Sequence, residues 1–292
     1  MKNQTILITG ATAGIGRATA LYLAQRGHHV IATGRRQAEL DRLVTEAGPS
    51  LRISAIALDV TNPESIAAAV TSVDTLTNGA GLDALVNNAG FGVMGPLSEL
   101  SDADLRRQYD TNVFGLMAVT RAFLPAMRER ARGSRAGARI VNVSSIGGRV
   151  TFPFMGAYNS TKYALESLSD ALRYELAPFG IAVSLIEPGV IRTEFAETAM
   201  SPVSRFESSV YGPAIAKADV LRQRMEATAV GPDVVARAIH KALTARRPAA
   251  RYVAPRFGHL LLAMLAVTPT CVADALFRRM SFLSRRELAP PA

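Results

Sequence analysis

The chain contains 292 residues, of which 49% are hydrophobic and 20% are charged. This composition is sufficient for a large core and excludes disorder along most of the chain. The single cysteine, Cys271, excludes an intrachain disulfide and a cysteine-based zinc site, and we expect it to be a small buried hydrophobic residue.

The net charge of +9 is concentrated in two places. Residues 246–292 contain eight Arg and only two acidic residues. A second basic cluster is formed by Arg128, Arg130, Arg132, Arg135 and Arg139. Such surfaces attract anionic membranes, acidic carrier proteins or nucleic acids. No nucleic-acid-binding motif accompanies the charge, so we expect no nucleic-acid partner.

Short apolar runs alternate with segments of helical periodicity along the first two thirds of the chain. The expected strands and helices, in chain order, are strand 5–9, helix 14–26, strand 29–33, helix 37–47, strand 53–59, helix 63–76, strand 82–88, helix 101–130, strand 139–145, helix 157–177 and strand 181–187. This alternation predicts parallel βαβ units. The expected fold class is therefore α/β, a doubly wound, Rossmann-like parallel sheet.

The pattern changes after residue 187. Residues 191–228 are weakly periodic, and we interpret them as a substrate lid. The remaining expected elements are helix 231–245, strand 251–254 and two short amphipathic helices at 257–267 and 270–283. We therefore expect one domain over residues 1–255, a C-terminal helical extension over 256–283 and a disordered tail over 284–292.

A glycine-rich turn, TGATAGIG at residues 9–16, joins the first expected strand to the first helix. Glycines permit a tight turn and close backbone approach, so that a pyrophosphate can lie at the helix N-terminus. The spacing differs from the commoner GxGxxG, but the position in the first βα unit favours dinucleotide binding. The residues expected to hold the cofactor here are Gly10, Thr12, Ala13, Gly14, Ile15 and Gly16.

The second strand is followed by Arg35 and Arg36, with no acidic residue. NAD sites usually place an acid here for the ribose hydroxyl, whereas an arginine accommodates the 2′-phosphate of NADP. We therefore predict NADP as the cofactor, with a solvated, charged helix N-terminus as the alternative reading. Asp59 and Asn87 close the third and fourth strands at the ligand-binding edge, although ordinary turn chemistry also explains them.

Ser145, Tyr158 and Lys162 are the residues that indicate chemistry most clearly. Tyr158 and Lys162 are four residues apart and share a helical face. An ammonium near a phenol favours phenolate, so we expect the pKa of Tyr158 to lie below its ordinary value of about 10. Such a tyrosine can exchange a proton with a carbonyl or alcohol oxygen, and Ser145 can hydrogen-bond the same oxygen.

Together these motifs resemble the classical short-chain dehydrogenases/reductases. The resemblance covers about residues 4–195 and includes TGATAGIG, DV at Asp59, NNAG at Asn87, TNVFG around Asn112, VNVSS ending at Ser145, YNSTK from Tyr158 to Lys162, and PGVIRT from Pro188 to Thr193. The extension after residue 255 is similar to that of members acting on steroids, retinoids and other lipophilic carbonyls.

The resemblance implies a role for each matching position. Tyr158 is the expected acid/base, Lys162 the residue that lowers its pKa and holds the nicotinamide ribose, and Asn112 the support of a proton relay. Ser145 orients the substrate carbonyl, with Ser144 as the competing candidate. The other expected cofactor contacts are Asp59, Val60, Asn87, Ala89, Gly90, Pro188, Ile191 and Thr193.

The expected function is an NADP-dependent oxidoreductase that interconverts a carbonyl and an alcohol on a small hydrophobic substrate. Met94, Phe152 and Met155 are candidates to line the substrate pocket, or else to pack a loop. The alternatives are a 3-oxoacyl-thioester reductase and a non-catalytic NADP-binding regulator. The histidines show no metal-ligand spacing, so we expect no metal.

The longest apolar stretch, residues 260–267, is far shorter than the roughly 20 residues that a membrane span needs. We expect a cytoplasmic protein, with peripheral membrane contact through the basic C-terminal helices as an open alternative to simple helix packing. The resemblance implies a homodimer or homotetramer that associates through the two long helices.

Overall fold

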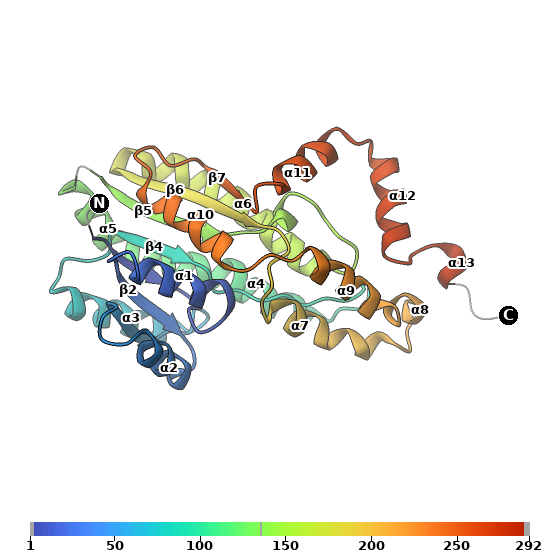
Figure 1. Ribbon diagram of the computed structural model, residues 1–292, viewed down its shortest axis with the longest axis horizontal. Coiled ribbons are helices and arrows are strands. Elements are labelled where there is room, and N and C mark those ends of the chain that lie inside the picture. The colour runs from blue at the N-terminus through green and yellow to red at the C-terminus, as the bar shows by residue number, and fades with distance from the viewer. Residues whose placement is uncertain (1–2, 135, 289–292) are drawn as a thin grey trace.

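Seven parallel strands form one sheet at the centre of the computed structural model, which describes residues 3–134 and 136–288 (Figure 1). The strands are β1 (Thr5–Ile8), β2 (His29–Gly34), β3 (Ile53–Ala57), β4 (Ala84–Asn87), β5 (Ala138–Val143), β6 (Ile181–Pro188) and β7 (Arg251–Ala254). Their order is β3-β2-β1-β4-β5-β6-β7, which confirms the doubly wound α/β fold. Arg135, a member of the predicted basic cluster, lies outside the described residues.

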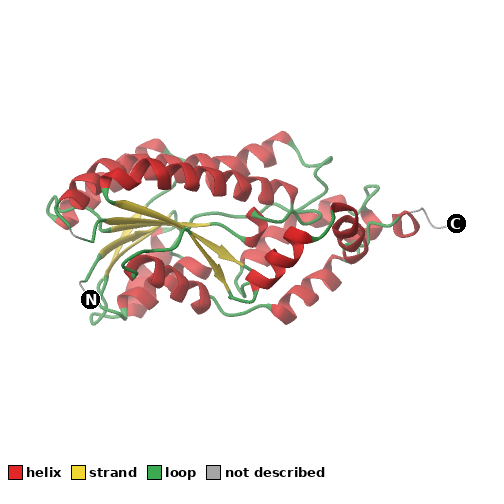
Figure 2. Ribbon diagram, turned by 90° about the horizontal axis from the view of Figure 1, so that it is seen from above, coloured by secondary structure: helices red, strands yellow, loops and turns green. Residues whose placement is uncertain are grey.

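Helices cover both faces of the sheet, as Figure 2 shows. One layer contains α1 (Gly14–Ala24), α2 (Gln37–Ala47) and α10 (Asp233–Thr244), and the other contains α3 (Pro63–Thr77), α5 (Leu116–Arg132) and α6 (Gly156–Leu176). Strand β1 shows why both layers are needed. Ile6 and Ile8 pack into the first layer and Leu7 into the second, all of them fully buried, because successive side chains of a strand face opposite ways.

The helix expected over residues 101–130 is interrupted in its middle. Helix α4 (Asp102–Tyr109) leads into a π-helical segment (Asp110–Gly115) before α5 begins. Within this segment a Cβ on Gly115 would lie 2.7 Å from the carbonyl oxygen of Val60, so the backbone closely approaches the loop that follows β3. π-Helical turns inside α-helices are frequent at functional sites, and this one contains Asn112.

Four short helical segments occupy the region predicted as a lid. They are α7 (Phe195–Met200), a 3₁₀ segment (Ser201–Phe206), α8 (Gly212–Ile215) and α9 (Ala218–Thr228). Phe206 and Ile215 pack with Met94 and Ala157 in a satellite apolar cluster. The region therefore has a small core of its own, beside the carboxyl ends of the strands.

The chain ends in α11 (Gly258–Val267), α12 (Thr270–Met280) and α13 (Arg285–Leu288). We call Arg256 to Met280 the C-terminal arm; α11 and α12 stand away from the sheet in Figure 1. Two expectations are wrong here. Cys271 is exposed rather than buried, and residues 285–288 form a helical turn where disorder was expected. Residues 289–292 lie outside the described part.

Among the described residues, no helix is both long enough and apolar enough to span a bilayer.

A charged cluster holds the edge strand β7 against α6 and β6. The Arg251 guanidinium lies 2.9 Å from a carboxylate oxygen of Glu166, 2.6 Å from Asp170 and 3.3 Å from Glu187. Glu187 is fully buried and also pairs with Arg149 at 3.3 Å. Burial raises the pKa of both Glu166 and Glu187, and the arginines oppose this effect. Arg251 therefore supplies the charge that these buried carboxylates require.

We predict that Arg251→Ala lowers the free energy of unfolding by about 3 kcal/mol, because it leaves buried carboxylates without a partner. Urea unfolding followed by circular dichroism measures this change. Arg132→Ala is the matched control, since Arg132 pairs with Glu129 at an exposed site, and it should cost less than about 0.5 kcal/mol. Equal losses in the two variants would show that the buried cluster contributes no net stability.

Candidate active site

A cleft of about 660 Å³ opens at the carboxyl ends of the central strands. This is where ligands bind in open α/β sheets. It brings together most of the residues predicted from sequence: Gly10, Thr12, Ala13, Gly14, Ile15, Arg35, Asp59, Val60, Ala89, Gly90, Met94, Ser145, Phe152, Met155, Tyr158, Lys162, Pro188, Ile191 and Thr193. Four predicted residues do not line it, namely Gly16, Arg36, Asn87 and Asn112.

The glycine-rich turn has the geometry of a nucleotide cradle. Gly10 and Gly14 adopt left-handed φ angles of +65° and +52°, which favour glycine. A Cβ on Gly16 would lie 2.2 Å from the carbonyl oxygen of Gly10, so only glycine lets α1 begin this close to β1. No described side chain caps the first turn of α1, which leaves its backbone N–H groups facing the cleft.

The NNAG segment supports this turn from the neighbouring strand. The Asn88 side-chain amide donates to the carbonyl oxygens of Thr9 and Gly10, both at 3.0 Å. In return, the Thr9 hydroxyl oxygen accepts from the backbone N–H groups of Asn88 and Ala89 at 2.9 and 3.0 Å. The cradle is therefore rigid, and its uncapped N-terminus and close backbone fit a dinucleotide pyrophosphate.

Asn87 was predicted to contact the cofactor, but its side chain points elsewhere. It is buried and donates to the Thr120 hydroxyl and to the Asn142 amide oxygen, each at 2.9 Å. Its neighbour Asn88 lines the cleft instead. Consecutive strand residues face opposite sides of the sheet, so the NN pair presents only one side chain to the site.

Arg35 and Asp59 lie at the outer end of the cleft, after β2 and β3. Burial acts to raise the pKa of Asp59, but hydrogen bonds from Thr61 and the charge of Arg35 together lower it below its ordinary value. No ion pair to Arg35 is present among the described residues, and its exposed guanidinium borders the space where β2 ends. Arg36 is exposed and does not line this space.

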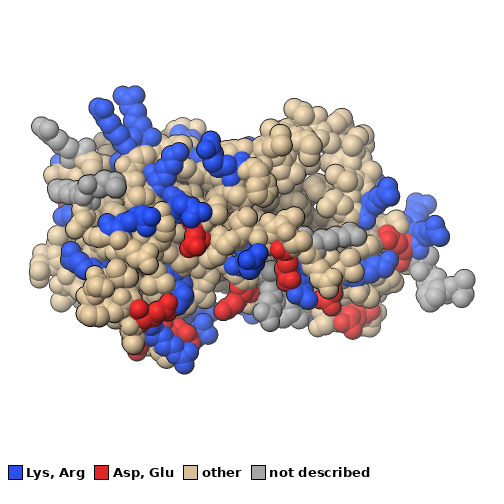
Figure 3. Space-filling model, viewed as in Figure 1, with Lys and Arg blue, Asp and Glu red and all other residues tan. Residues whose placement is uncertain are grey.

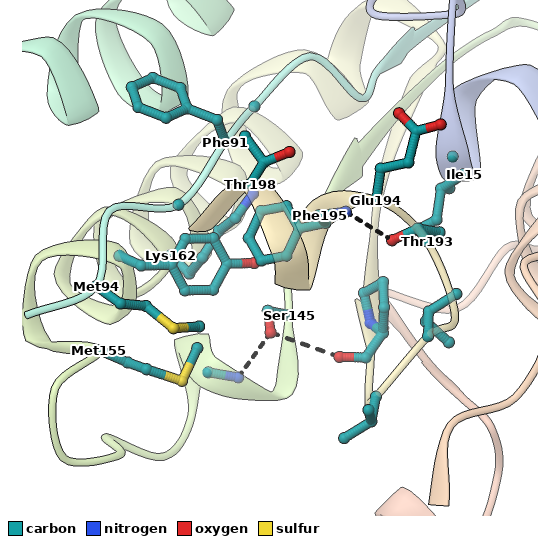
Figure 4. A pocket seen from close by; sticks show the side chains of 18 of the residues that line it. Ile15, Phe91, Met94, Ser145, Met155, Lys162, Thr193, Glu194, Phe195 and Thr198 are labelled. Carbon is teal, nitrogen blue, oxygen red and sulfur yellow. Dashed lines mark hydrogen bonds between the residues drawn. The ribbon is translucent and has the colours of Figure 1, made fainter. Parts of the chain in front are cut away.

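At the inner end, α6 carries Tyr158 and Lys162, both more than nine-tenths buried. The Lys162 ammonium donates to the Val143 carbonyl oxygen at 2.9 Å and lies 5.6 Å from the Tyr158 ring centroid. The Ser145 hydroxyl oxygen accepts from the Gly147 N–H at 3.0 Å and donates to the Pro188 carbonyl at 3.5 Å (Figure 4). Ser144 also borders the cleft but is only 2% exposed.

Burial raises the pKa of Tyr158 to about 12, and the Ser145 hydroxyl acts in the opposite direction. Burial also lowers the pKa of Lys162 to about 8, against the effect of the Glu166 carboxylate. The prediction that Lys162 holds the tyrosine pKa below its ordinary value is therefore wrong for this structure. The reason is geometric, because Lys162 directs its ammonium to Val143 and leaves the desolvation of Tyr158 dominant.

Asn112 lies behind the cleft wall. Its side-chain amide donates to the Phe91 carbonyl oxygen at 3.0 Å and to the Thr161 hydroxyl at 3.1 Å, and its oxygen accepts from the Phe91 N–H at 3.1 Å. A Cβ on Gly90 would meet the Asn112 amide oxygen at 3.1 Å and the Lys162 ammonium at 3.8 Å. Asn112 thus fixes the backbone next to Lys162.

The space beside Ser145 is apolar. Met94 and Met155 lie close together on one side of it, and Phe195 packs 5.3 Å from the Tyr158 ring (Figure 4). Sequence reasoning missed further apolar residues of this wall, which include Phe91, Phe195, Val203, Ile215, Leu261, Phe277 and Met280. Many come from residues 195–215 and the C-terminal arm, where no motif marks them.

No cluster of three or more His, Cys, Asp or Glu side chains suited to a metal occurs in the part of the chain that the structure describes.

Comparisons with known proteins agree with this geometry. The family model for short chain dehydrogenases matches residues 4–203. The chain is 36% identical to the uncharacterized oxidoreductase YbbO of Escherichia coli K12, over 94% of each chain. It is 31% identical to a 3-ketodihydrosphingosine reductase of Bacteroides thetaiotaomicron, over 94% of this chain and 95% of the relative. Identity to human retinol dehydrogenase 5 is 35%, over 94% of this chain and 87% of the relative.

Solved structures are similar as well. A Burkholderia phymatum short chain dehydrogenase/reductase in complex with NAD has a TM-score of 0.76 at 25% identity, covering 90% of this chain and 92% of its own. A Burkholderia cenocepacia short chain dehydrogenase in complex with NADP has a TM-score of 0.71 at 25% identity, covering 96% and 98%. This chain belongs to the short-chain dehydrogenase family and is an NAD(P)-binding oxidoreductase that acts on CH–OH groups.

Proposed function

We propose that this enzyme interconverts a hydrophobic ketone or aldehyde and the corresponding alcohol, with NADP as cofactor and Tyr158 as general acid/base. The observation that carries the proposal is the placement of Ser145, Tyr158 and Lys162 at the point where the nucleotide cradle meets an apolar pocket. In such a pocket a substrate carbonyl can lie against both hydroxyl groups while its apolar body contacts Met94, Phe152 and Met155.

The nicotinamide ring, when bound, supplies or accepts the hydride at the substrate carbon. Residues of the chain itself then transfer the proton to or from the substrate oxygen. At neutral pH the buried Tyr158 phenol is protonated, since its pKa is raised to about 12, so it is ready to donate to the carbonyl oxygen. Ser145 donates a hydrogen bond to the same oxygen and holds it in place. The Lys162 ammonium stabilises the phenolate that remains, and Asn112 keeps the adjoining backbone in position.

The preference for NADP rests on Arg35. It borders the outer end of the cleft, where the adenosine ribose of a dinucleotide bound in the cradle would lie, and no acidic side chain follows β2 to bind a free 2′-hydroxyl. A planar guanidinium binds a phosphate through two parallel hydrogen bonds. A 2′-phosphate is therefore the matching ligand.

The substrate class rests on the apolar wall and on the named relatives, which include a 3-ketodihydrosphingosine reductase and a retinol dehydrogenase. Both names denote long, lipophilic substrates. Of the two alternatives, a non-catalytic regulator is disfavoured because Ser145, Tyr158 and Lys162 are all present and brought together. The second alternative is a 3-oxoacyl-thioester reductase, and turnover assays with short 3-oxoacyl thioesters test it.

We also propose a homodimer or homotetramer that associates through α5 and α6. Exposed aromatic side chains lie on α6 and on the π-helical segment that precedes α5: Tyr174 is 67% exposed and Phe114 is 61% exposed. Aromatic residues are enriched in protein interfaces. The exposed thiol of Cys271 fits a reducing compartment and therefore the cytoplasm.

We predict that Tyr158→Phe lowers the turnover of a bulky hydrophobic ketone at least about a hundredfold, because the proton donor is lost. NADPH binding should be retained, since the cradle is untouched. Steady-state kinetics and fluorescence titration of NADPH measure the two effects. Tyr163→Phe is the matched control on the exposed side of the same helix and should leave both unchanged. Substantial turnover by Tyr158→Phe would remove Tyr158 from the acid role.

We predict that Arg35→Ala weakens NADPH binding by about ten- to a hundredfold and leaves NADH binding nearly unchanged, because only NADPH offers a 2′-phosphate. Titrations of both nucleotides against both proteins measure the difference. Arg36→Ala, whose side chain lies outside the cleft, is the control and should have a smaller effect. Equal losses for the two nucleotides would mean that another residue recognises the phosphate.

A further inference from the structure

Helix α11 is apolar except for His259 and yet is largely uncovered. Its sequence is GHLLLAMLAV, and Gly258 is its only buried residue. A helix of this kind normally lies inside a protein core or in a lipid environment. It packs against the body at β7, and several of its large side chains face outward.

The exposed apolar side chains of the C-terminal arm lie in stripes and are not scattered over its surface. On α11 Leu260 is 75% exposed, Met264 53% and Val267 82%, and their spacing of four and three residues places them on one side of the helix. Val272 and Leu276 continue the apolar surface on α12, where they are 54% and 46% exposed. A contiguous apolar surface on a soluble chain marks a place of interaction.

Positive charge flanks this surface. The exposed arginines of the arm and of α13 are Arg256, Arg278, Arg279, Arg285 and Arg286. No ion pair to any of them occurs within residues 3–134 and 136–288. The acidic residues of the segment are Asp274 and Glu287, and Glu287 pairs with Lys217. Figure 3 shows an uncharged surface over α11 and α12, with basic side chains beside it toward α13.

We propose that the C-terminal arm binds the surface of an anionic lipid bilayer, with the apolar stripe of α11 and α12 among the acyl chains and the arginines at the headgroups. The ten residues of α11 extend only roughly 15 Å, half the thickness of a bilayer core, so the helix lies in the interface and does not span it. Apolar and basic surfaces on one helical segment are the requirements for such binding.

The charge distribution favours lipid over a second copy of this chain. Two copies that docked through the arm would bring two arginine-rich rims together with few acidic residues to neutralise them. An anionic headgroup layer supplies the opposite charge and attracts each arginine that lies near it.

The arm has a second face, which closes the substrate end of the cleft. Leu261, Phe277 and Met280 line that space, and the ring of Phe277 packs edge-on against Phe152 at 5.6 Å. A lipid held at the outer face of the arm is therefore next to the mouth of the apolar pocket. We infer that the arm delivers a bilayer-resident substrate to Tyr158, a step that rests on the proposed function.

Co-sedimentation of the full chain with vesicles tests the binding step. Vesicles of phosphatidylcholine with phosphatidylglycerol should retain the protein, more weakly as salt rises, and pure phosphatidylcholine vesicles should retain much less. Leu260→Asp/Val267→Asp should lower binding by about tenfold or more, because two inserted side chains become charged. Leu76→Asp/Val220→Asp is the matched control, with similar residues exposed at 40% and 41% on other helices.

The results separate the possible occupants of the surface. Absence of binding by the natural chain, or equal binding by both double variants, would overturn the proposal. A dimer in sedimentation velocity that only Leu260→Asp/Val267→Asp disrupts, without vesicle binding, would make the surface an interface between copies and also overturn it.

Delivery is tested with one lipophilic ketone embedded in the vesicles and one water-soluble ketone. Leu260→Asp/Val267→Asp should reduce kcat/KM for the embedded ketone about tenfold or more and leave that for the soluble ketone unchanged. Equal rates of the natural chain and this variant on the embedded ketone would refute delivery. Absence of turnover of either ketone by the natural chain would count against the proposed function, while the vesicle result would still decide binding.

Discussion

The direction of the strands is the constraint on which the site depends. All seven strands are parallel, so all their carboxyl ends lie along one edge. Strand β1 lies between β2 and β4, and the connections on its two sides run in opposite directions, which leaves a crevice at that edge. The glycine turn after β1, Arg35 after β2, Asp59 after β3 and Ser145 after β5 meet there although they are far apart in sequence. The fold alone accounts for their proximity.

Burial then determines what these groups can do. Tyr158 and Lys162 are withdrawn from water, which favours the neutral form of each and moves their pKa values apart, that of Tyr158 to about 12 and that of Lys162 to about 8. In the mechanism that we propose, a proton that leaves the phenol therefore creates an ion pair in a dry site, where the attraction is strong. Deeper in the sheet, the Asn142 side chain accepts from Asn87 and donates to Ser169. The catalytic end is thus rigid as well as dry.

Most of the helices and strands could be predicted from the sequence, because hydrophobic periodicity and turn residues are local signals. Helix α2 has the predicted bounds, and the strands differ from prediction by a residue or two at their ends. The π-helical turn at Asn112 could not be predicted, since it depends on the close approach of Gly115 to Val60. The direction of the Asn87 side chain, the exposure of Cys271 and the pKa of Tyr158 also depend on neighbours from distant segments.

In the C-terminal arm the apolar pattern of the sequence has two possible structural explanations. Apolar residues at 260–267 predict a helix equally well for a packed pair and for a membrane surface, because both require the same periodicity. Only the arrangement in space distinguishes them. Leu261 and Phe277 turn toward the cleft, while Leu260 and Val267 remain exposed. An arm with two apolar faces and a basic rim has more apolar surface than packing against one body requires. Under our proposal a lipid bilayer covers this excess apolar surface, which lies beside the pocket to which we assign a hydrophobic substrate.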